Sequence, residues 1–185
     1  TLGITVYTIG YLAKLYAALG DSAKAESLYQ RALAIQEKAL GPDHLGVTGS
    51  LDTLSELYWT TGSYAKSEPL FERALAIREK TLMPSDFAVV ESRANLASVY
   101  AKIGEYAKAE SLLQRALAIW EKQLGPDPPQ AAVAINNLAV LYTAMGDYVK
   151  AEKFSLRALA ILNEARDPDD PDVATVLDTL AKLYR

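Results

Sequence analysis

Among its 185 residues the sequence has no cysteine and only one histidine. Disulfide cross-links and thiolate chemistry are therefore excluded. His44 has no second histidine and no cysteine with which to hold zinc, so we interpret it as a loop residue of the Gly41-Pro-Asp-His44 turn. We expect no metal and no other cofactor. The lack of cysteine suits a reducing compartment, and we therefore expect a cytoplasmic protein.

Long apolar runs and an excess of basic charge are also missing. No apolar run approaches the roughly 18 residues that span a bilayer. The chain has 23 acidic and 19 basic residues, a net charge of −4, and so lacks the basic surface that nucleic acids and anionic membranes require. It has neither a phosphate-binding loop of the form G-x-x-x-x-G-K-[ST] nor a nucleophile elbow. We expect no enzymatic activity, no nucleic-acid partner and no membrane association.

The sequence repeats itself every 42 residues. The pentapeptide Arg-Ala-Leu-Ala-Ile starts at Arg31, Arg73, Arg115 and Arg157, with spacings of 73 − 31 = 42, 115 − 73 = 42 and 157 − 115 = 42. Three other series keep the same step: Gly20, Gly62, Gly104 and Gly146; Pro42, Pro84, Pro126 and Pro168; Tyr16, Tyr58, Tyr100, Tyr142 and Tyr184. A period of this length indicates a stack of small structural units, each unable to bury its apolar faces alone.

Each unit is predicted to be a pair of helices. Leu51, Leu54 and Leu57 recur at helical spacing, and Gly62 then ends the first helix by adopting a left-handed conformation. Pro84 ends the second helix and Asp86 caps the next one. The predicted first helices are 3–19, 45–61, 87–103, 129–145 and 171–184, and the second helices are 22–40, 64–82, 106–124 and 148–165. His44 and Pro128 occupy the capping slot of Asp86 and Asp170 and should cap less well.

The second helices carry a small residue next to a large one. Ala32, Ala74, Ala116 and Ala158 let a neighbouring helix approach, and Leu33, Leu75, Leu117 and Leu159 fill the space between helices. These series are interpreted as packing. Aromatic residues outside the period are better candidates for function than those that keep it, but local packing explains them equally well. They are Tyr7, Tyr11, Tyr29, Trp59 and Trp120.

The run Leu-Tyr, Gly-x-Tyr, Ala-Glu, Arg-Ala-Leu-Ala-Ile, Glu-Lys, Leu-Gly-Pro-Asp resembles the tetratricopeptide repeat in its 42-residue, kinesin-light-chain-like form. The resemblance implies an all-α, right-handed superhelical solenoid of helix-turn-helix repeats. We treat residues 1–185 as one array. Residues 1–11 are the end of an incomplete preceding unit or the start of the first helix, and the following units are repeats 12–53, 54–95, 96–137 and 138–179, with a truncated fifth unit at 180–185.

The acidic run Asp167-Pro-Asp-Asp-Pro-Asp172 could also be a calcium site, because hard cations bind several carboxylates. It lies at the same place in the repeat as Gly41-Pro-Asp-His44, however, and lacks the glycine and distal glutamate of a helix-loop-helix calcium site. We therefore favour a turn between repeats in which Asp170 caps the last helix.

In the tetratricopeptide family the first helices line a concave groove that binds peptides. Carried over by helical spacing, the resemblance implies a groove lined by Tyr7, Tyr11, Lys14, Asp52, Thr53, Glu56, Trp59, Thr60, Glu91, Asn95, Ser98, Lys102, Asn136, Asn137 and Thr143. Asn95 and Asn137 match asparagines that kinesin light chain repeats present to cargo, and an amide can both donate to and accept from a peptide backbone. Thr53 and Thr179 replace the amide in other units, so the series is incomplete.

Charge favours one kind of ligand over another. Asp52, Glu56 and Glu91 outnumber Lys102 at the centre of this face, which predicts a basic or polar ligand. Co-chaperones of the same superfamily clamp a terminal carboxylate with lysine, arginine and asparagine. Here Gly10, Thr53 and Glu91 stand at those positions, so we do not expect binding of chaperone tails.

We expect a protein-interaction scaffold that binds a peptide or partner protein in this groove. One alternative is a regulatory or sensor array of a larger enzyme or signalling ATPase. The other is a structural array that assembles end to end, because Leu2, Ile4, Val6 and Ile9 at one end and Val173, Val176, Leu177, Leu180, Leu183 and Tyr184 at the other form apolar stripes.

Overall fold

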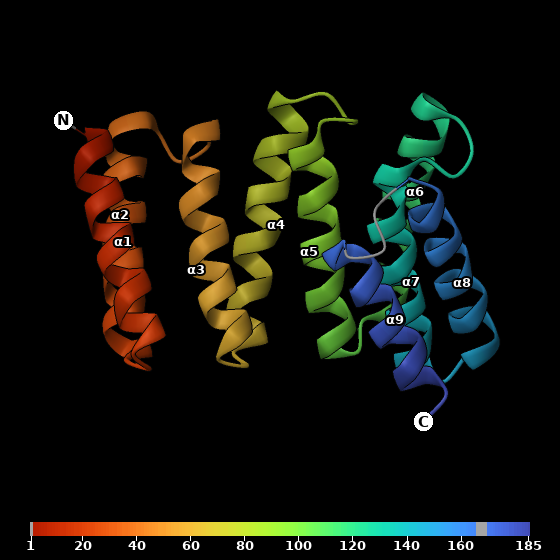
Figure 1. The fold of residues 1–185 in the computed structure, drawn as a ribbon. Helices are drawn as coiled ribbons and strands as arrows, with labels where there is room; N and C mark the ends of the chain where they lie inside the picture. Colours follow the sequence, from red (N-terminus) through yellow and green to blue (C-terminus); the bar gives the residue numbers. More distant parts are fainter. Residues whose placement is uncertain (1, 166–169) are drawn as a thin grey trace. The chain divides into compact units, whose positions relative to one another are not determined.

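The computed structural model describes residues 2–165 and 170–185, and within these ranges it contains nine α-helices and no strand (Figure 1). The first helices of the repeats are α1 (Leu2–Ala18), α3 (Thr48–Thr60), α5 (Phe87–Ile103), α7 (Ala132–Met145) and α9 (Pro171–Leu183). The second helices are α2 (Ser22–Leu40), α4 (Tyr64–Thr81), α6 (Tyr106–Leu124) and α8 (Tyr148–Ala165). The predicted all-α class is confirmed, and the predicted helix boundaries agree to within a few residues.

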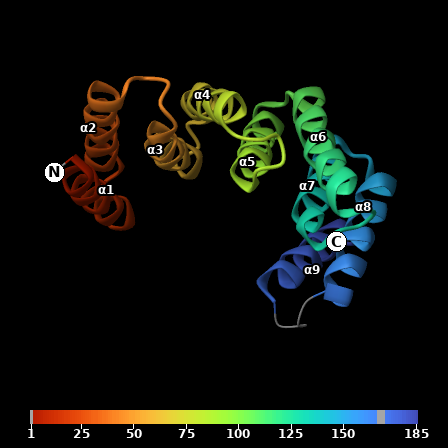
Figure 2. The same cartoon turned by 90° about the horizontal axis from the view of Figure 1, so that it is seen from above.

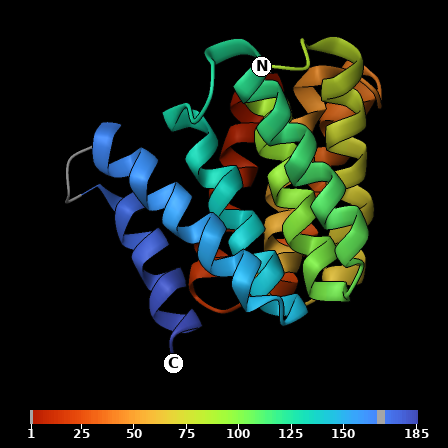
Figure 3. The ribbon, with the colours of Figure 1, turned by 90° about the vertical axis from the view of Figure 1, so that its right-hand side faces the viewer.

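The chain forms two compact units, Thr1–Met83 and Pro84–Arg185, which are described separately. In the first unit, α1 pairs with α2 and α3 pairs with α4, and α2 packs against α3 to join the two hairpins (Figure 2). In the second unit, α5 pairs with α6 and α7 with α8, and α7 contacts both α5 and α9. Figure 3 shows α8 and α9 side by side in the second unit.

A left-handed glycine closes the first helix of each hairpin, as predicted. Gly104 has φ 86° and Gly146 has φ 77°. The N–H of the residue after each glycine donates to a carbonyl of the helix that has just ended. Glu105 N donates to Tyr100 O at 2.8 Å, and Asp147 N donates to Tyr142 O at 2.9 Å. This arrangement satisfies carbonyl groups that the helix end would otherwise leave without a partner.

The first helices begin in two different ways. Asp86 and Asp170 each accept a hydrogen bond from the N–H two residues later, at 2.9 Å, and the α-helix follows directly. At the equivalent places after His44 and Pro128 the chain first makes a short 3-10 turn, Leu45–Val47 or Pro129–Ala131. His44 nevertheless acts as a cap, because its Nδ1 accepts from Gly46 N at 3.0 Å.

The acidic run before α9 lies partly outside the described residues, which omit 166–169. The predicted capping role of Asp170 is confirmed by its hydrogen bond to Asp172 N.

Small residues stand where the two helices of a hairpin cross. Ser67 Oγ in α4 donates to the backbone carbonyl of Ser55 in α3 at 2.9 Å, and both serines are fully buried. The other hairpins have alanine at these two positions, also buried: Ala13 and Ala25, Ala97 and Ala109, Ala139 and Ala151. Side chains this small let the two helices pack closely, so that the hydroxyl of one helix reaches a backbone carbonyl of the other.

The periodic alanines and leucines of the second helices form the core, as expected. Ala74, Ala116 and Ala158 are fully buried, and Leu75 and Leu117 are buried as well. Leu159 is only half-buried. Two aromatic residues outside the period also belong to this core, because Tyr29 and Trp120 are both buried.

Polar contacts between consecutive repeats recur at the repeat period. Tyr58 Oη on α3 donates to Glu26 Oε1 on α2 at 2.7 Å, and Tyr142 Oη on α7 donates to Glu110 Oε1 on α6 at 2.6 Å. Tyr184 makes the same bond to Glu152. Each bond joins the first helix of one repeat to the second helix of the repeat before it.

The arginine of the repeated pentapeptide makes a second set of such contacts. Arg73 Nη1 donates to Glu37 Oε1 at 2.6 Å, and so links α4 to α2. Arg157 on α8 forms ion pairs with Glu121 on α6 and with Asp127 in the preceding turn. The packing interpretation of the pentapeptide covers only its apolar residues, and the structure adds this bridging role for its arginine.

The expectation of an uncovered apolar stripe on the last helix is wrong in part. Leu180 is only 7% exposed, and Val173 and Val176 are also buried, because α9 packs against α7 and α8. On this helix Leu177 remains exposed. On α1, by contrast, Ile4, Leu12 and Leu15 are exposed.

The different burial of Leu75 and Leu159 predicts different losses of folding stability when each is replaced by alanine. Leu75→Ala should lower the free energy of unfolding by about 2–5 kcal/mol, because it removes buried methyl groups and leaves a cavity. Leu159→Ala should cost less, since that side chain is half-buried. Urea unfolding followed by circular dichroism measures both values. Equal losses for the two variants would contradict the assigned packing.

The bond between Tyr142 and Glu110 predicts a pH dependence. Burial, together with the hydrogen bond to the Glu110 carboxylate, raises the pKa of Tyr142 to about 12. An unfolded tyrosine titrates near pH 10, so the neutral phenol is favoured in the folded state. The stability it contributes is therefore complete below about pH 10 and is lost as the pH rises towards 12.

Tyr142→Phe should be less stable than the unaltered chain at pH 8, by about 1.5 kcal/mol, because a hydrogen bond to a charged acceptor is lost. This difference should shrink between pH 10 and 12. The exposed Tyr148→Phe is the matched control and should leave the pH profile unchanged. Urea unfolding at several alkaline pH values gives the comparison, and a difference that stays constant with pH would refute the assignment.

Candidate partner-binding site

The candidate groove residues all lie on first helices, as the sequence predicted. The first unit contains Tyr7, Tyr11 and Lys14 on α1, and Asp52, Thr53, Glu56, Trp59 and Thr60 on α3. The second unit contains Glu91, Asn95, Ser98 and Lys102 on α5, and Asn136, Asn137 and Thr143 on α7. Each unit therefore carries its own part of the candidate site.

The aromatic residues of the first unit differ in their surroundings. Tyr7 and Tyr11 are 75% and 58% exposed on neighbouring turns of α1. Trp59 is half-buried, and its ring meets the ring of Tyr64 edge to face, with centroids 5.1 Å apart. Part of the Trp59 surface is thus used in the turn between α3 and α4, and only the remainder can contact a partner.

Asp52 is engaged within its own unit. Arg78 Nη1 on α4 donates to Asp52 Oδ1 at 3.0 Å, and a second bond joins Arg78 Nη2 to Asp52 Oδ2. The two side chains are only 21% and 12% exposed for Asp52 and Arg78, respectively. The charge of Asp52 is therefore already compensated, which removes it from the acidic surplus that we expected to attract a basic ligand.

The hydroxyl groups of the candidate site are used as donors inside their helices. Thr53 Oγ1 donates to Gly49 O at 2.7 Å, Ser98 Oγ to Ala94 O at 3.1 Å, and Thr143 Oγ1 to Ala139 O at 2.9 Å. Thr60 Oγ1 likewise donates to Leu57 O. These groups can only accept hydrogen bonds from a partner. Asn95 and Asn137 are half-buried, and Glu91 and Lys102 are exposed.

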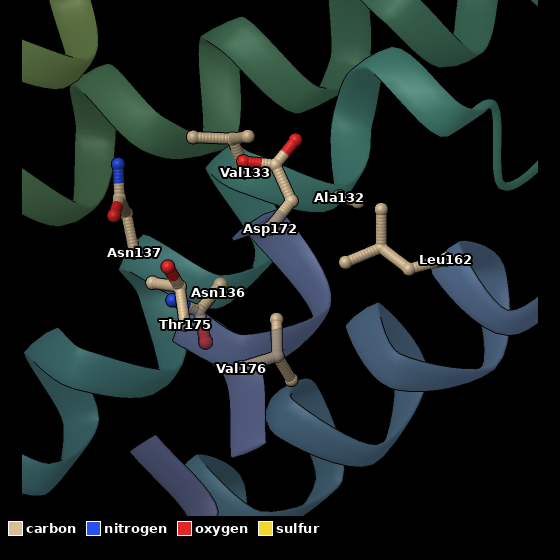
Figure 4. Close-up of a pocket in the computed structure, with 8 residues that line it drawn as sticks. All are labelled: Ala132, Val133, Asn136, Asn137, Leu162, Asp172, Thr175 and Val176. Atoms are coloured by element: carbon tan, nitrogen blue, oxygen red, sulfur yellow. The ribbon is translucent and has the colours of Figure 1, made fainter. Parts of the chain in front are cut away.

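Asn136 lies at a small pocket in the second unit. Asn136 is 5% exposed, and its Oδ1 has no hydrogen-bond partner among the residues that the structure describes. The pocket has a volume of about 60 Å³ and lies between α7, α8 and α9 (Figure 4). Its lining comprises Ala132, Val133, Asn136, Asn137, Leu162, Asp172, Thr175 and Val176.

The described residues were also compared with the requirements of a metal site and of a membrane span. Among residues 2–165 and 170–185, no group of three or more His, Asp or Glu side chains is placed to hold a metal ion. In the same part of the chain, no helix has both the length and the apolar character needed to cross a membrane.

Comparison with known families decides the class. A family model described as tetratricopeptide repeat matches residues 5–80, 86–164 and 130–185. The chain belongs to the tetratricopeptide repeat family. Folds of this family are typically protein-interaction scaffolds without catalytic activity. Among curated proteins there is no match.

Solved tetratricopeptide structures agree with this assignment. BtubC (BKLC) of P. vanneervenii is 30% identical with a TM-score of 0.80, covering 99% of this chain and 73% of its own. A Podosopora anserina protein, described as a kinesin light chain with nearly identical TPR-like repeats, is 27% identical with a TM-score of 0.78, covering 97% of this chain and 85% of its own. A Rap protein complexed with Competence and Sporulation Factor shares the fold at 21% identity and a TM-score of 0.77, covering 100% of this chain and 49% of its own.

Two features of the tetratricopeptide surface were missed from the sequence. One is Arg78, which neutralises Asp52. The other is the contribution of Asp172 and Thr175 on α9 to the pocket beside Asn136. Comparing corresponding positions of the repeats could have indicated both features. Residues 52 and 78 correspond to residues 136 and 162 two repeats later, and these positions vary between repeats.

Proposed function

We propose that this chain is a protein-interaction scaffold that binds a peptide or a partner protein through residues on the first helices of its repeats. The observation that carries the proposal is the match to the tetratricopeptide family along almost the whole chain. The Rap protein, which has the same fold, was solved with a bound factor, so a fold of this kind can hold a partner. We propose no catalytic role.

The side chains that would contact the partner are those with free surface on the first helices. Tyr7 and Tyr11 offer exposed rings, and Asn95 and Asn137 offer half-buried amides that can pair with a peptide backbone. The preference for a basic or polar ligand now depends less on Asp52, which is paired with Arg78, and more on Glu91. A cytoplasmic location stays a prediction.

The proposal can be tested without knowing the natural partner. Peptides that bind the intact chain would be selected from a random display library and measured by fluorescence anisotropy. Trp59→Ala and Asn95→Ala should each weaken binding by about tenfold, because the first removes an aromatic side chain of the kind that anchors interfaces and the second removes an amide that can pair with a peptide backbone. Circular dichroism establishes that the variants are folded.

Matched controls lie elsewhere on the molecule. Tyr148→Ala removes an exposed aromatic residue from α8, and Lys80→Ala removes an exposed polar residue from α4. Both should bind as the unaltered chain does. If folded Trp59→Ala and Asn95→Ala variants also bind as tightly as the unaltered chain, the face of the first helices is not the binding site.

End-to-end self-association stays a prediction. Because Leu180 is buried, the prediction is tested with exposed apolar residues of α1 instead. Ile4 and Leu15 are exposed and share one side of that helix. We expect sedimentation velocity to show reversible association that weakens in the Ile4→Ser, Leu15→Ser double variant, because contact between exposed apolar surfaces drives it. A single species of monomer mass at every concentration of the unaltered chain would exclude this.

A further inference from the structure

The first helix hairpin, α1 and α2, has the same junction residues as the fourth, α7 and α8, which lies 3 × 42 = 126 residues later. Each hairpin has two leucines and a tyrosine on its first helix, and a lysine and an arginine on its second. In the first hairpin these residues are Leu12, Leu15, Tyr16, Lys24 and Arg31, and in the fourth they are Leu138, Leu141, Tyr142, Lys150 and Arg157.

The leucines at these positions are covered by the preceding repeat. Leu138 and Leu141 on α7 are 0% and 2% exposed. Leu180, at the same repeat position on α9, is also buried, and α9 packs against the two helices of the preceding repeat, α7 and α8. By contrast, Leu12 and Leu15 are 42% and 44% exposed. On α1, the face with which other first helices bury these leucines is therefore uncovered.

The polar groups beside these leucines bind two glutamates in the fourth repeat. Tyr142 Oη donates to Glu110 Oε1 at 2.6 Å, and Arg157 forms an ion pair with Glu121. Both glutamates lie on α6, and 121 − 110 = 11 residues separate them, which is close to three helical turns, or roughly 16 Å. The same spacing recurs on α2, where the two glutamates are Glu26 and Glu37.

The corresponding donors of the first hairpin have no acceptor. Among the residues that the structure describes, neither the Tyr16 hydroxyl nor the Arg31 guanidinium has a hydrogen-bond or ion-pair partner. Arg31 is exposed and Tyr16 is half-buried, so both side chains have surface that a partner can contact. We call the surface formed by Leu12, Leu15, Tyr16 and Arg31 the first-hairpin face.

The tyrosine of this face is already held as in the fourth hairpin. Lys24 Nζ lies 5.1 Å from the ring centroid of Tyr16 and 2.8 Å from the carboxylate of Asp21. In the fourth hairpin the corresponding distances are 4.8 Å and 3.0 Å. Because the face is preorganised in this way, little ordering of its side chains opposes binding.

Another copy of this chain does not offer the required helix. The glutamates of α2 and α6 are bound to the next repeat. Glu79 on α4 also has an interaction of its own. On α8, Glu152 is bound to Tyr184, and Asn163 stands where the second glutamate would be. Two copies in contact could cover the leucines of α1, but they would leave both donors of the first-hairpin face without acceptors.

We infer that the first-hairpin face binds an amphipathic helix of a partner protein, which carries two glutamates at the spacing found on α6. One glutamate accepts from Tyr16 Oη and the other from the Arg31 guanidinium, as charge-assisted hydrogen bonds. Apolar side chains between the two glutamates cover Leu12 and Leu15. The inference goes beyond the proposed function, because no residue of this face belongs to the candidate groove.

The test uses a synthetic peptide with the sequence of α6, Tyr106–Leu124, as the probe. The peptide carries a fluorophore, and its binding to the intact chain is measured by fluorescence anisotropy. A second peptide with Glu110→Gln and Glu121→Gln keeps the shape of the first and loses both negative charges. It should bind at least about tenfold more weakly, because charge-assisted hydrogen bonds are lost.

Variants of the chain test the two contacts. Arg31→Ala and Tyr16→Phe should each weaken binding of the α6 peptide by about tenfold. Tyr16→Phe keeps the ring that contacts Lys24, and circular dichroism establishes that both variants are folded. Lys38→Ala is the matched control, because it removes an exposed positive charge from the same helix as Arg31, and it should bind as the unaltered chain does.

Coupling between chain and peptide tests which glutamate each donor binds. The Arg31→Ala chain should no longer distinguish the α6 peptide from its Glu121→Gln form, but it should still bind the Glu110→Gln form more weakly. The Tyr16→Phe chain should show the reverse pattern. A merely structural role of either side chain would not produce this exchange.

Sedimentation velocity distinguishes a partner helix from a second copy. With saturating α6 peptide, the chain should sediment as one chain with one peptide. Association between chains that persists under these conditions would assign the face to a second copy and overturn the inference. It is also overturned if neither peptide binds, if both bind equally, or if Arg31→Ala has no effect. The groove proposal is judged separately, by the effects of Trp59→Ala and Asn95→Ala on the peptides selected from the display library.

Discussion

The close crossing of the two helices in each hairpin is the constraint on which the rest of the structure depends. Ser67 shows how close it is, because its hydroxyl reaches the backbone carbonyl of Ser55 at 2.9 Å. At this distance there is no room for a larger side chain at either position, and the other three hairpins have alanine there. Burying an entire helix face in this way leaves the opposite faces to be covered by the neighbouring repeat. The apolar leucines and the tyrosine and arginine contacts between repeats all serve that second requirement.

The helices could be predicted from the sequence because their limits depend on local chemistry. Left-handed Gly104 and Gly146 end helices, and Asp86 and Asp170 begin them, each through groups within a few residues of the chain. The 3-10 turns before α3 and α7 were not predicted; they occur in the two repeats where His44 or Pro128 stands in place of the aspartate. Repetition of these signals every 42 residues made them easy to recognise.

The contacts of the candidate site could not be predicted in the same way. Helical spacing shows which residues share a face, but it does not show which of them already have partners. Asp52 is on the expected helix and yet is paired with Arg78, 26 residues later. Asn136 is also on the expected helix, but it is buried, and the pocket beside it depends on α9, from the next repeat. Such relations between helices depend on three-dimensional packing, and only comparison of corresponding positions in different repeats indicates them.

The hydrogen bonds from Tyr58 to Glu26 and from Tyr142 to Glu110 have a consequence for mechanics. Each lies across a junction between repeats, where its two partners belong to helices that a pulling force would separate. Under tension a junction of this kind opens as a discrete event, because a short directional bond gives way over a small displacement, whereas apolar contact yields gradually. Each unit should therefore extend in steps of one repeat, and should recover its length when the force is released.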